Sequence, residues 1–263
     1  VGTTNRTNLA DYETAIGPNT GLILKVHRSN FFMDGFVESP LRDELSKLAR
    51  ESGVPLVEDL GSGALTDTEK AAGLTREPTP AEAIRAGVDL VCFSGDKLMG
   101  GPQAGIIAGN AGHVGRMKRN PFFRALRCDR LVLGAMQAVV DHLLADKPTP
   151  VSDMMSASVD ELRKRAETIR QALADVSARI EIGEGKAQVG GGTLPRDTIP
   201  SVTLDIHATN RSATRLAADL RRSAPPVISY PSQKILKLDL RTVFPEQDET
   251  LTKCLGEVLR NQE

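Results

Sequence analysis

Apolar runs alternate with amphipathic stretches through the first half of the chain, which predicts strands that alternate with helices. Continuous apolar runs such as 21–27 are typical of strands buried in a parallel sheet, because both of their faces are covered. Leucine and alanine recur at helical spacing over 41–52, and Gly53 is a typical helix end. Such alternation predicts a mostly parallel sheet covered on both faces. The predicted elements are strands at 21–27, 54–57, 88–93 and 104–108, and helices at 41–52 and 80–86.

The pattern changes around Pro148 and Pro150, which separate two long helical stretches. Beyond these prolines, a glycine-rich loop interrupts shorter apolar runs that alternate with helical ones. We therefore expect two domains: the larger, residues 1–147, and a small α/β domain, residues 148–263. The elements predicted here are helices at 131–144, 151–176, 212–222 and 247–260, and strands at 179–182, 201–206 and 235–240.

Composition excludes several classes of protein. The 263 residues, 40% hydrophobic and 25% charged, suffice for a sizeable core in one large or two modest domains. Only 3% are aromatic and the net charge is −1, so no stacking platform or general basic surface for nucleic acid is predicted. The three cysteines are widely spaced, so reduced thiols and no metal site are expected. Without a long apolar run or a signal-peptide pattern, we expect a soluble cytoplasmic protein.

The most informative segment runs from Phe93 to Gly105 and carries Lys97 on a glycine-punctuated turn, directly after a predicted buried strand. A lysine in this setting can form a Schiff base with pyridoxal phosphate, a cofactor that withdraws electrons from carbanions. For an isolated Ser-Gly-x-Lys sequence, a surface lysine on an ordinary turn is the commoner explanation.

Two further polar residues, His27 and Asp59, also follow predicted strands. Because ligands of parallel sheets bind beyond the carboxyl ends of the strands, we expect both to share a site with Lys97. Asp59 could keep the pyridine nitrogen of the cofactor protonated, or it could cap a turn, and Glu58 competes for the same role. A histidine at a strand end is more often structural.

A basic run spans residues 116–130, with six positive side chains and one aspartate. Arg124 and Arg127 are three positions apart, so on a helix their guanidinium groups would point the same way. Two such groups form a fork for a tetrahedral oxyanion. The other basic side chains of the run are expected to be solvated or to contact an RNA backbone.

These segments resemble bacterial selenocysteine synthase (L-seryl-tRNA selenium transferase) over almost all of the chain. The most specific parts are the Lys97 loop and the Arg-Ala-Leu-Arg motif at 124–127. The resemblance implies a fold-type-I pyridoxal-phosphate-dependent transferase: a truncated large domain with a mostly parallel sheet, plus a small C-terminal α/β domain. It implies conversion of seryl-tRNA(Sec) to selenocysteinyl-tRNA(Sec) with selenophosphate, through an aminoacrylyl intermediate. The family forms cytoplasmic homo-oligomers, rings of dimers.

The resemblance also implies roles for individual residues. Lys97 would be the catalytic lysine, and Asp96 would assist in proton transfer or in positioning the terminal adenosine. The glycine run 190–192 matches a family loop that faces the active site, although it could also be a simple hinge. The implied cofactor-binding residues are Lys97, Asp59, His27 and Ser94. The implied substrate-binding residues are Arg124 and Arg127 for selenophosphate, together with Asn30, Thr3 and Thr4.

The chain departs from the family at several places. It opens at Val1 without methionine, so we expect a fragment lacking an N-terminal RNA-binding domain and part of the cofactor domain. Because fold-type-I enzymes anchor the cofactor phosphate on a loop that would precede Val1, we expect this chain alone to bind pyridoxal phosphate weakly or not at all, and to be inactive by itself. Arg28 replaces a common threonine, and 228–232 replaces a Gly-Arg-containing turn.

Two alternatives stay open at this point. A pyridoxal-phosphate-dependent lyase or a cysteine desulfurase acting on a free amino acid would share Lys97 and Asp59. Such an enzyme needs an arginine for the free α-carboxylate, and Arg124 or Arg127 could serve. A tRNA-binding or assembly module without catalysis would instead bind no cofactor.

Overall fold

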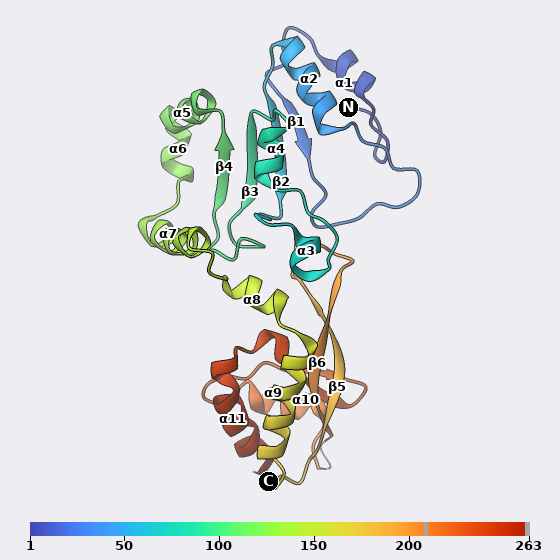
Figure 1. The fold of residues 1–263 in the computed structure, drawn as a ribbon, viewed down its shortest axis with the longest axis vertical. Coiled ribbons are helices and arrows are strands. Elements are labelled where there is room, and N and C mark those ends of the chain that lie inside the picture. The colour runs from blue at the N-terminus through green and yellow to red at the C-terminus, as the bar shows by residue number, and fades with distance from the viewer. Residues whose placement is uncertain (208–209, 261–263) are drawn as a thin grey trace. The chain divides into compact units, whose positions relative to one another are not determined.

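The computed structural model describes residues 1–207 and 210–260 of the chain. These residues divide into two compact units, and Figure 1 labels their elements along the chain. The first unit comprises Val1–Ser152 and Val189–Asp197, and the second comprises Asp153–Gln188 and Thr198–Glu263. A short segment from the second half of the sequence therefore belongs with the first unit, which bears directly on the site described below.

The first unit is built on a four-stranded sheet, in the order β1-β2-β3-β4. Strands β1 (Ile23–Val26), β2 (Leu56–Gly61) and β3 (Leu90–Ser94) are parallel, and β4 (Gly105–Gly109) is antiparallel to β3. The expected α/β fold with a mostly parallel sheet is confirmed. The four predicted strands are confirmed in order, with boundaries shifted by a few residues, because hydrogen bonding rather than hydrophobicity sets where each strand ends.

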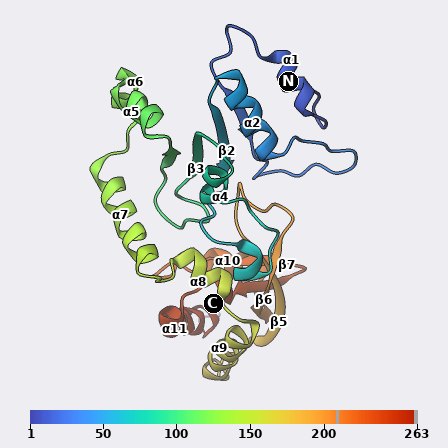
Figure 2. The same cartoon turned by 45° about the horizontal axis from the view of Figure 1, so that its top comes forward.

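Helices cover one face of this sheet. Helix α2 (Arg42–Ser52) ends at Gly53, whose φ of 65° is a left-handed conformation that glycine adopts without steric strain. Helix α4 (Pro80–Arg85) is capped at its start by the Thr79 side chain. Figure 2 shows both helices beside the strands. The core between the helices and the sheet is made of aliphatic side chains from each, including Ile23, Leu45, Ala49, Leu56, Ala83, Val91 and Phe93. Part of α7 (Arg130–Leu144) packs against the same core.

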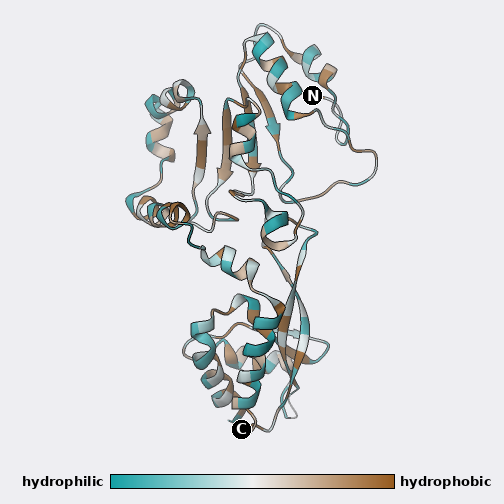
Figure 3. Cartoon of the chain, viewed as in Figure 1, coloured by the Kyte–Doolittle hydropathy of each residue, from teal (hydrophilic) through white to brown (hydrophobic). Residues whose placement is uncertain are grey.

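The opposite face of the sheet is open, which corrects the expectation of a sheet covered on both faces. Leu24, Val26 and Ile107 are 51%, 60% and 45% exposed. Strand pairing aligns Val26, Asp59, Cys92 and Ile107 across this face. Figure 3 shows the apolar character of the strands. The strands therefore have the apolar sequences of a sheet covered on both faces, but the helices of this unit cover only one of them.

The second unit contains an antiparallel sheet in the order β5-β6-β8-β7. Strands β5 (Arg179–Gln188) and β6 (Thr198–His207) form a long pair, to which β8 (Ile235–Asp239) and β7 (Tyr230–Ser232) are added. The predicted strand at 179–182 is thus the first part of β5, and the predicted strand at 201–206 is the inner part of β6. Their outer ends are polar, so the hydrophobic pattern could not reveal them.

Three helices close the core of the second unit: α9 (Val159–Ala172), α10 (Ala213–Leu220) and α11 (Asp248–Arg260). The helix predicted over 151–176 is wrong as a single element, because α8 (Pro150–Ser156) and α9 are separate. Ser158 begins α9 through a capping box with Glu161, a signal strong enough to start a new helix.

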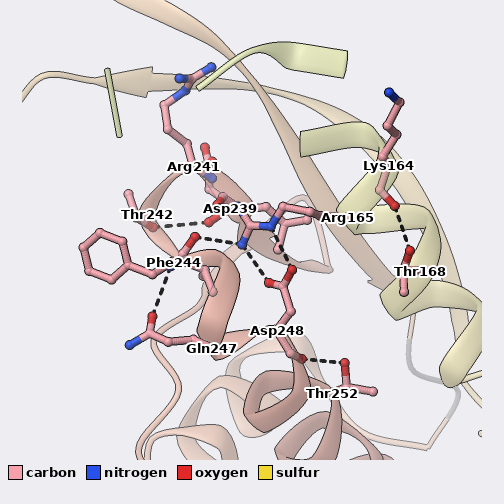
Figure 4. Close-up of polar contacts among 12 residues, drawn as sticks. Lys164, Arg165, Thr168, Asp239, Arg241, Thr242, Phe244, Gln247, Asp248 and Thr252 are labelled. Atoms are coloured by element: carbon pink, nitrogen blue, oxygen red, sulfur yellow. Dashed lines mark hydrogen bonds and ion pairs between the residues drawn. The ribbon is translucent and has the colours of Figure 1, made fainter. Parts of the chain in front are cut away.

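Two arginines, the buried Arg241 and the partly buried Arg165, tie this unit together. Arg165 on α9 binds Asp248 at the start of α11 through Nε (2.8 Å) and Nη2 (2.7 Å), and Nη2 also donates to the Val243 carbonyl (2.8 Å; Figure 4). Arg241 donates to the carbonyls of Met154, Ala157 and Pro200. Burial lowers the pKa of Arg241, although Asp239 opposes this shift. Both arginines therefore serve the packing of this unit.

Several elements span too few residues to show a periodicity from which they could be predicted. In the first unit these are α1 (Leu9–Ala15), α3 (Thr68–Ala72), α5 (Ala111–Arg119) and α6 (Pro121–Leu126), and in the second β7, η1 (Leu240–Thr242) and η2 (Pro245–Gln247). Within residues 1–207 and 210–260, no helix combines the length and hydrophobicity that spanning a bilayer requires.

Candidate active site

Lys97 lies on the loop that connects β3 to β4, and backbone hydrogen bonds fix this loop at both ends. The Gly95 N–H donates to the Ala104 carbonyl (2.8 Å), which closes the loop on itself. The Leu98 N–H donates to the Ser62 carbonyl (3.1 Å), just beyond β2. Lys97 is therefore held against the carboxyl end of the neighbouring strand, and its side chain is half-buried.

Glycine backbones approach the Lys97 amine closely. Its Nζ donates to the Gly192 carbonyl oxygen (3.2 Å). A Cβ on Gly192 would lie 3.0 Å from this nitrogen, and one on Gly61 would lie 4.0 Å from it. Gly63 is required nearby, because a Cβ there would come within 2.1 Å of the Ser94 carbonyl oxygen. A side chain at position 192 would therefore press on the amine, whereas one at position 61 would only touch it in ordinary van der Waals contact.

His27 follows β1, and its imidazole is oriented by a buried carboxylate. Its Nε2 lies 3.2 Å from Glu77 Oε2, and the Glu77 side chain is only 6% exposed. The His27 backbone N–H donates to the Asp59 carbonyl (2.8 Å), which links the ends of β1 and β2. Ser29 packs on Gly61 so closely that a Cβ there would lie 2.6 Å from its hydroxyl oxygen. His27 and Lys97 thus lie beyond the carboxyl ends of β1 and β3, and Asp59 lies within β2, two residues before that strand ends.

The neighbouring carboxylates Glu58 and Asp59 point to opposite faces of the sheet. Glu58 is buried and accepts two hydrogen bonds from Arg42 on α2, from Nε at 2.6 Å and Nη2 at 3.0 Å. Asp59 lies exposed on the open face. Burial raises the pKa of Cys92, and the nearby Asp59 carboxylate raises it further, so this thiol is held neutral. Glu58 is therefore occupied by Arg42, whereas Asp59 is available to a ligand.

The other predicted site residues are spread more widely. Ser94 is the last residue of β3, and Asp96 is exposed beside Lys97. Asn30 is exposed on the loop after β1, and the Thr3 hydroxyl donates to the Arg6 carbonyl (2.8 Å) in a local turn next to the exposed Thr4. In the described part of the chain, no hydrogen bond joins the two threonines or Asn30 to Lys97. The sheet edge brings together only the residues that follow its strands.

Arg124 and Arg127 lie at the end of α6, away from the core, and both are exposed. The helix ends at Leu126, and Arg127 is extended, with φ −66° and ψ 144°. The expectation that both arginines share one helical face is therefore wrong, because only Arg124 is helical. Neither guanidinium forms an ion pair with a carboxylate among the residues that the structure describes. Both remain free to bind an anion.

Sequence reasoning missed Glu77 and the contacts of the segment 189–197. Glu77 lies in a loop without a periodic pattern, and only its distance from His27 reveals it. In the segment, the Asp197 carboxylate accepts hydrogen bonds from Thr75, at 2.6 Å from N–H and 3.0 Å from the hydroxyl. The only sequence feature that pointed to the segment 189–197 was its glycine run at 190–192.

The sequence pattern of the L-seryl-tRNA selenium transferase family (SelA) matches residues 1–244 of this chain. The chain belongs to this family. A relative from Moorella thermoacetica, named L-seryl-tRNA(Sec) selenium transferase, is 43% identical over 268 residues, covering 98% of this chain and 56% of the relative. The namesake from Aquifex aeolicus is 39% identical over 262 residues, covering 98% of this chain and 58% of the relative. The chain thus spans little more than half the length of these family members.

Among solved structures, D-glucosaminate-6-phosphate ammonia-lyase superposes with a TM-score of 0.60 at 18% identity, covering 100% of this chain and 63% of that chain. At this level of identity the likeness concerns the fold alone. It agrees with the fold-type-I architecture that the family implies: a mostly parallel sheet followed by an antiparallel one.

Proposed function

We propose that the protein uses pyridoxal phosphate to convert seryl-tRNA(Sec) to selenocysteinyl-tRNA(Sec) with selenophosphate as the selenium donor. The observation that carries this proposal is the amine of Lys97, half-buried beyond the end of β3 and in contact with the Gly192 backbone, on a sheet whose next strand, β2, carries the exposed carboxylate of Asp59. Membership of the L-seryl-tRNA selenium transferase family supports the same activity. We further propose that the protein acts in the cytoplasm as a homo-oligomer.

The residues around Lys97 suit pyridoxal phosphate. An amine for covalent attachment and a carboxylate for the ring nitrogen are the two groups that this cofactor requires of its site. The hydroxyls of Ser62 and Thr193, each next to a glycine that faces the lysine, are buried and have no hydrogen-bond partner among the residues that the structure describes. Such hydroxyls are available to an oxyanion. When bound, the cofactor withdraws electrons from the α-carbon of an attached amino acid.

The protein's own groups supply positioning and proton transfer. Lys97 would hold the cofactor and, once displaced by the seryl amine, move a proton at its Nζ. Asp59 would keep a proton on the pyridine nitrogen through its charge. His27, held by Glu77, would lie over the same edge, and Asp96 is close enough in sequence to assist the lysine. Ser94 would complete the cofactor site.

The exposed arginines Arg124 and Arg127 would bind the selenophosphate oxyanion. Both are without a carboxylate partner within the described ranges, so their full donor capacity is available to an anion. The backbone of Arg127 is extended beyond the end of α6, so the helix does not align the two side chains. The two guanidinium groups would therefore meet at one anion by rotation of their long side chains. Asn30, Thr3 and Thr4 would contact the substrate from the loop after β1 and from the start of the chain.

A product assay tests the function. The purified full-length protein, rather than this chain alone, is incubated with pyridoxal phosphate and offered either seryl-tRNA(Sec) with selenophosphate, or free serine or free cysteine. We expect selenocysteine on the tRNA and no release of pyruvate or sulfide from the free amino acids. Turnover of free amino acids without any product on the tRNA would instead identify a lyase or a desulfurase. A protein that binds no cofactor and shows neither product would contradict both.

Replacing Arg124 and Arg127 by alanine should weaken the use of selenophosphate and leave tRNA binding nearly unchanged. Each charge-assisted pair contributes roughly 1.5–3 kcal/mol, so the donor concentration for half-maximal rate should rise by at least ~10-fold. Arg116 and Arg119 on the neighbouring α5 are the matched control, because their replacement by alanine removes the same charge. A loss of tRNA affinity with an unchanged donor requirement would assign the pair to the RNA surface.

A further inference from the structure

The segment 189–197 is fastened to the first unit at its far end by two neighbouring residues. Arg196 forms a bidentate ion pair with Asp34, with Nη1 at 3.0 Å from Oδ1, and its guanidinium carbon lies 3.5 Å from the centre of the Phe32 ring. Asp197 accepts two hydrogen bonds from Thr75. One end of the segment thus bridges the loop after β1 and the loop after α3.

Between these anchors and Lys97 the segment is tightly packed. Thr193 and Leu194 are 3% and 5% exposed, and the Asp197 N–H donates to the Leu194 carbonyl (3.1 Å). Gly192 adopts a positive φ of 81°, which turns its carbonyl oxygen toward the Lys97 amine. A shift at Arg196 would therefore be transmitted over four residues of fixed backbone to this carbonyl.

We propose that Arg196 is a positioning residue for Lys97: through Asp34 and Phe32 it holds the segment 189–197 so that the Gly192 carbonyl retains the Lys97 amine. The inference deepens the proposed function, on which it rests, by naming a residue that sets the orientation of the reactive amine. A carbonyl that accepts one hydrogen from Nζ restricts the rotation of a side chain that is otherwise flexible. It also shields the amine from competing electrophiles until a ligand displaces the contact.

The test measures the reactivity of Lys97 without cofactor or tRNA. The protein is treated with N-hydroxysuccinimide acetate, and acetylation of Lys97 is followed by mass spectrometry relative to the exposed Lys47. Arg196→Ala should raise the acetylation rate of Lys97, relative to that of Lys47, by about five-fold or more. A change of this size is what the loss of an exposed ion pair and a cation–π contact can produce. Asp34→Ala should raise the acetylation rate of Lys97 by a similar factor. The variant that carries both substitutions should raise it little further, since each substitution alone already breaks the Arg196–Asp34 pair.

Two further variants separate positioning from general loosening. Arg179→Ala removes another exposed arginine, which pairs with Glu181 on β5, and it should leave the acetylation rate of Lys97 unchanged. Arg196→Lys keeps the charge and should restore part of the protection. The proposal is overturned if hydrogen exchange in 189–197 rises in Arg196→Ala while the Lys97 rate does not, or if Arg179→Ala has the same effect. Because no cofactor is present, either result leaves the proposed function standing.

Discussion

Replacing Lys97 with alanine should abolish covalent attachment of pyridoxal phosphate and all formation of selenocysteinyl-tRNA. The reason is that no other lysine amine of the described chain lies beside the glycine backbones at this sheet edge. Attachment is measured with excess cofactor, as a visible absorbance band and, after borohydride, as a mass increase on the peptide that contains Lys97. Borohydride trapping makes the measurement sensitive even if the chain by itself binds the cofactor weakly.

Lys25 is the matched control for this experiment. Burial lowers its pKa, against the opposing effect of Glu58, so more of this amine is unprotonated at neutral pH than for an ordinary lysine. It would therefore be a competent nucleophile, but its Nζ lies toward Ser39 and Pro40 on the covered side of β1. Lys25→Ala should keep full attachment. Trapped cofactor on Lys97→Ala protein, or undiminished activity, would refute the role of Lys97.

Asp59→Asn should leave attachment through Lys97 intact but slow turnover by ~10²-fold or more, the range for removing a group that stabilises charge in the transition state. An amide cannot hold a proton on the ring nitrogen as a carboxylate does. The measurement is the single-turnover rate with saturating cofactor and substrates. Turnover equal to that of the wild type would exclude Asp59 as the partner of the ring nitrogen.

Glu58→Gln separates this effect from structural damage at the adjacent position. It breaks the buried pair with Arg42 and should lower the free energy of unfolding by roughly 2–3 kcal/mol, since Arg42 keeps some access to water. At temperatures where the variant is folded, its turnover should stay near that of the wild type. The opposite pattern, a stable but inactive Glu58→Gln protein, would show that the two carboxylates have been assigned the wrong way round.

Much of the fold could be predicted because it depends on local patterns. The parallel strands are continuous apolar runs, and α2 ends at Gly53 because only glycine adopts its conformation without cost. Helices and strands without such patterns were not predicted. The helices α5 and α6 are too short to display a helical repeat of apolar positions, and asparagine caps at Asn110 and Asn120 mark their starts instead. The break between α8 and α9 depends on a cap at Ser158, which competes with an otherwise continuous helical stretch.

The sequence by itself determined that His27 and Lys97 follow β1 and β3, because parallel strands separated by helices deliver their carboxyl ends to one edge. Asp59, predicted at a strand end, lies within β2 instead. Only the tertiary structure decided which of Glu58 and Asp59 is available, since strand alternation sends them to opposite faces and Arg42 occupies one. It also decided that residues near 192 and 196 meet Lys97 and Asp34, respectively. Such contacts join positions about a hundred or more residues apart, and no local periodicity records which backbone carbonyl will face a distant amine.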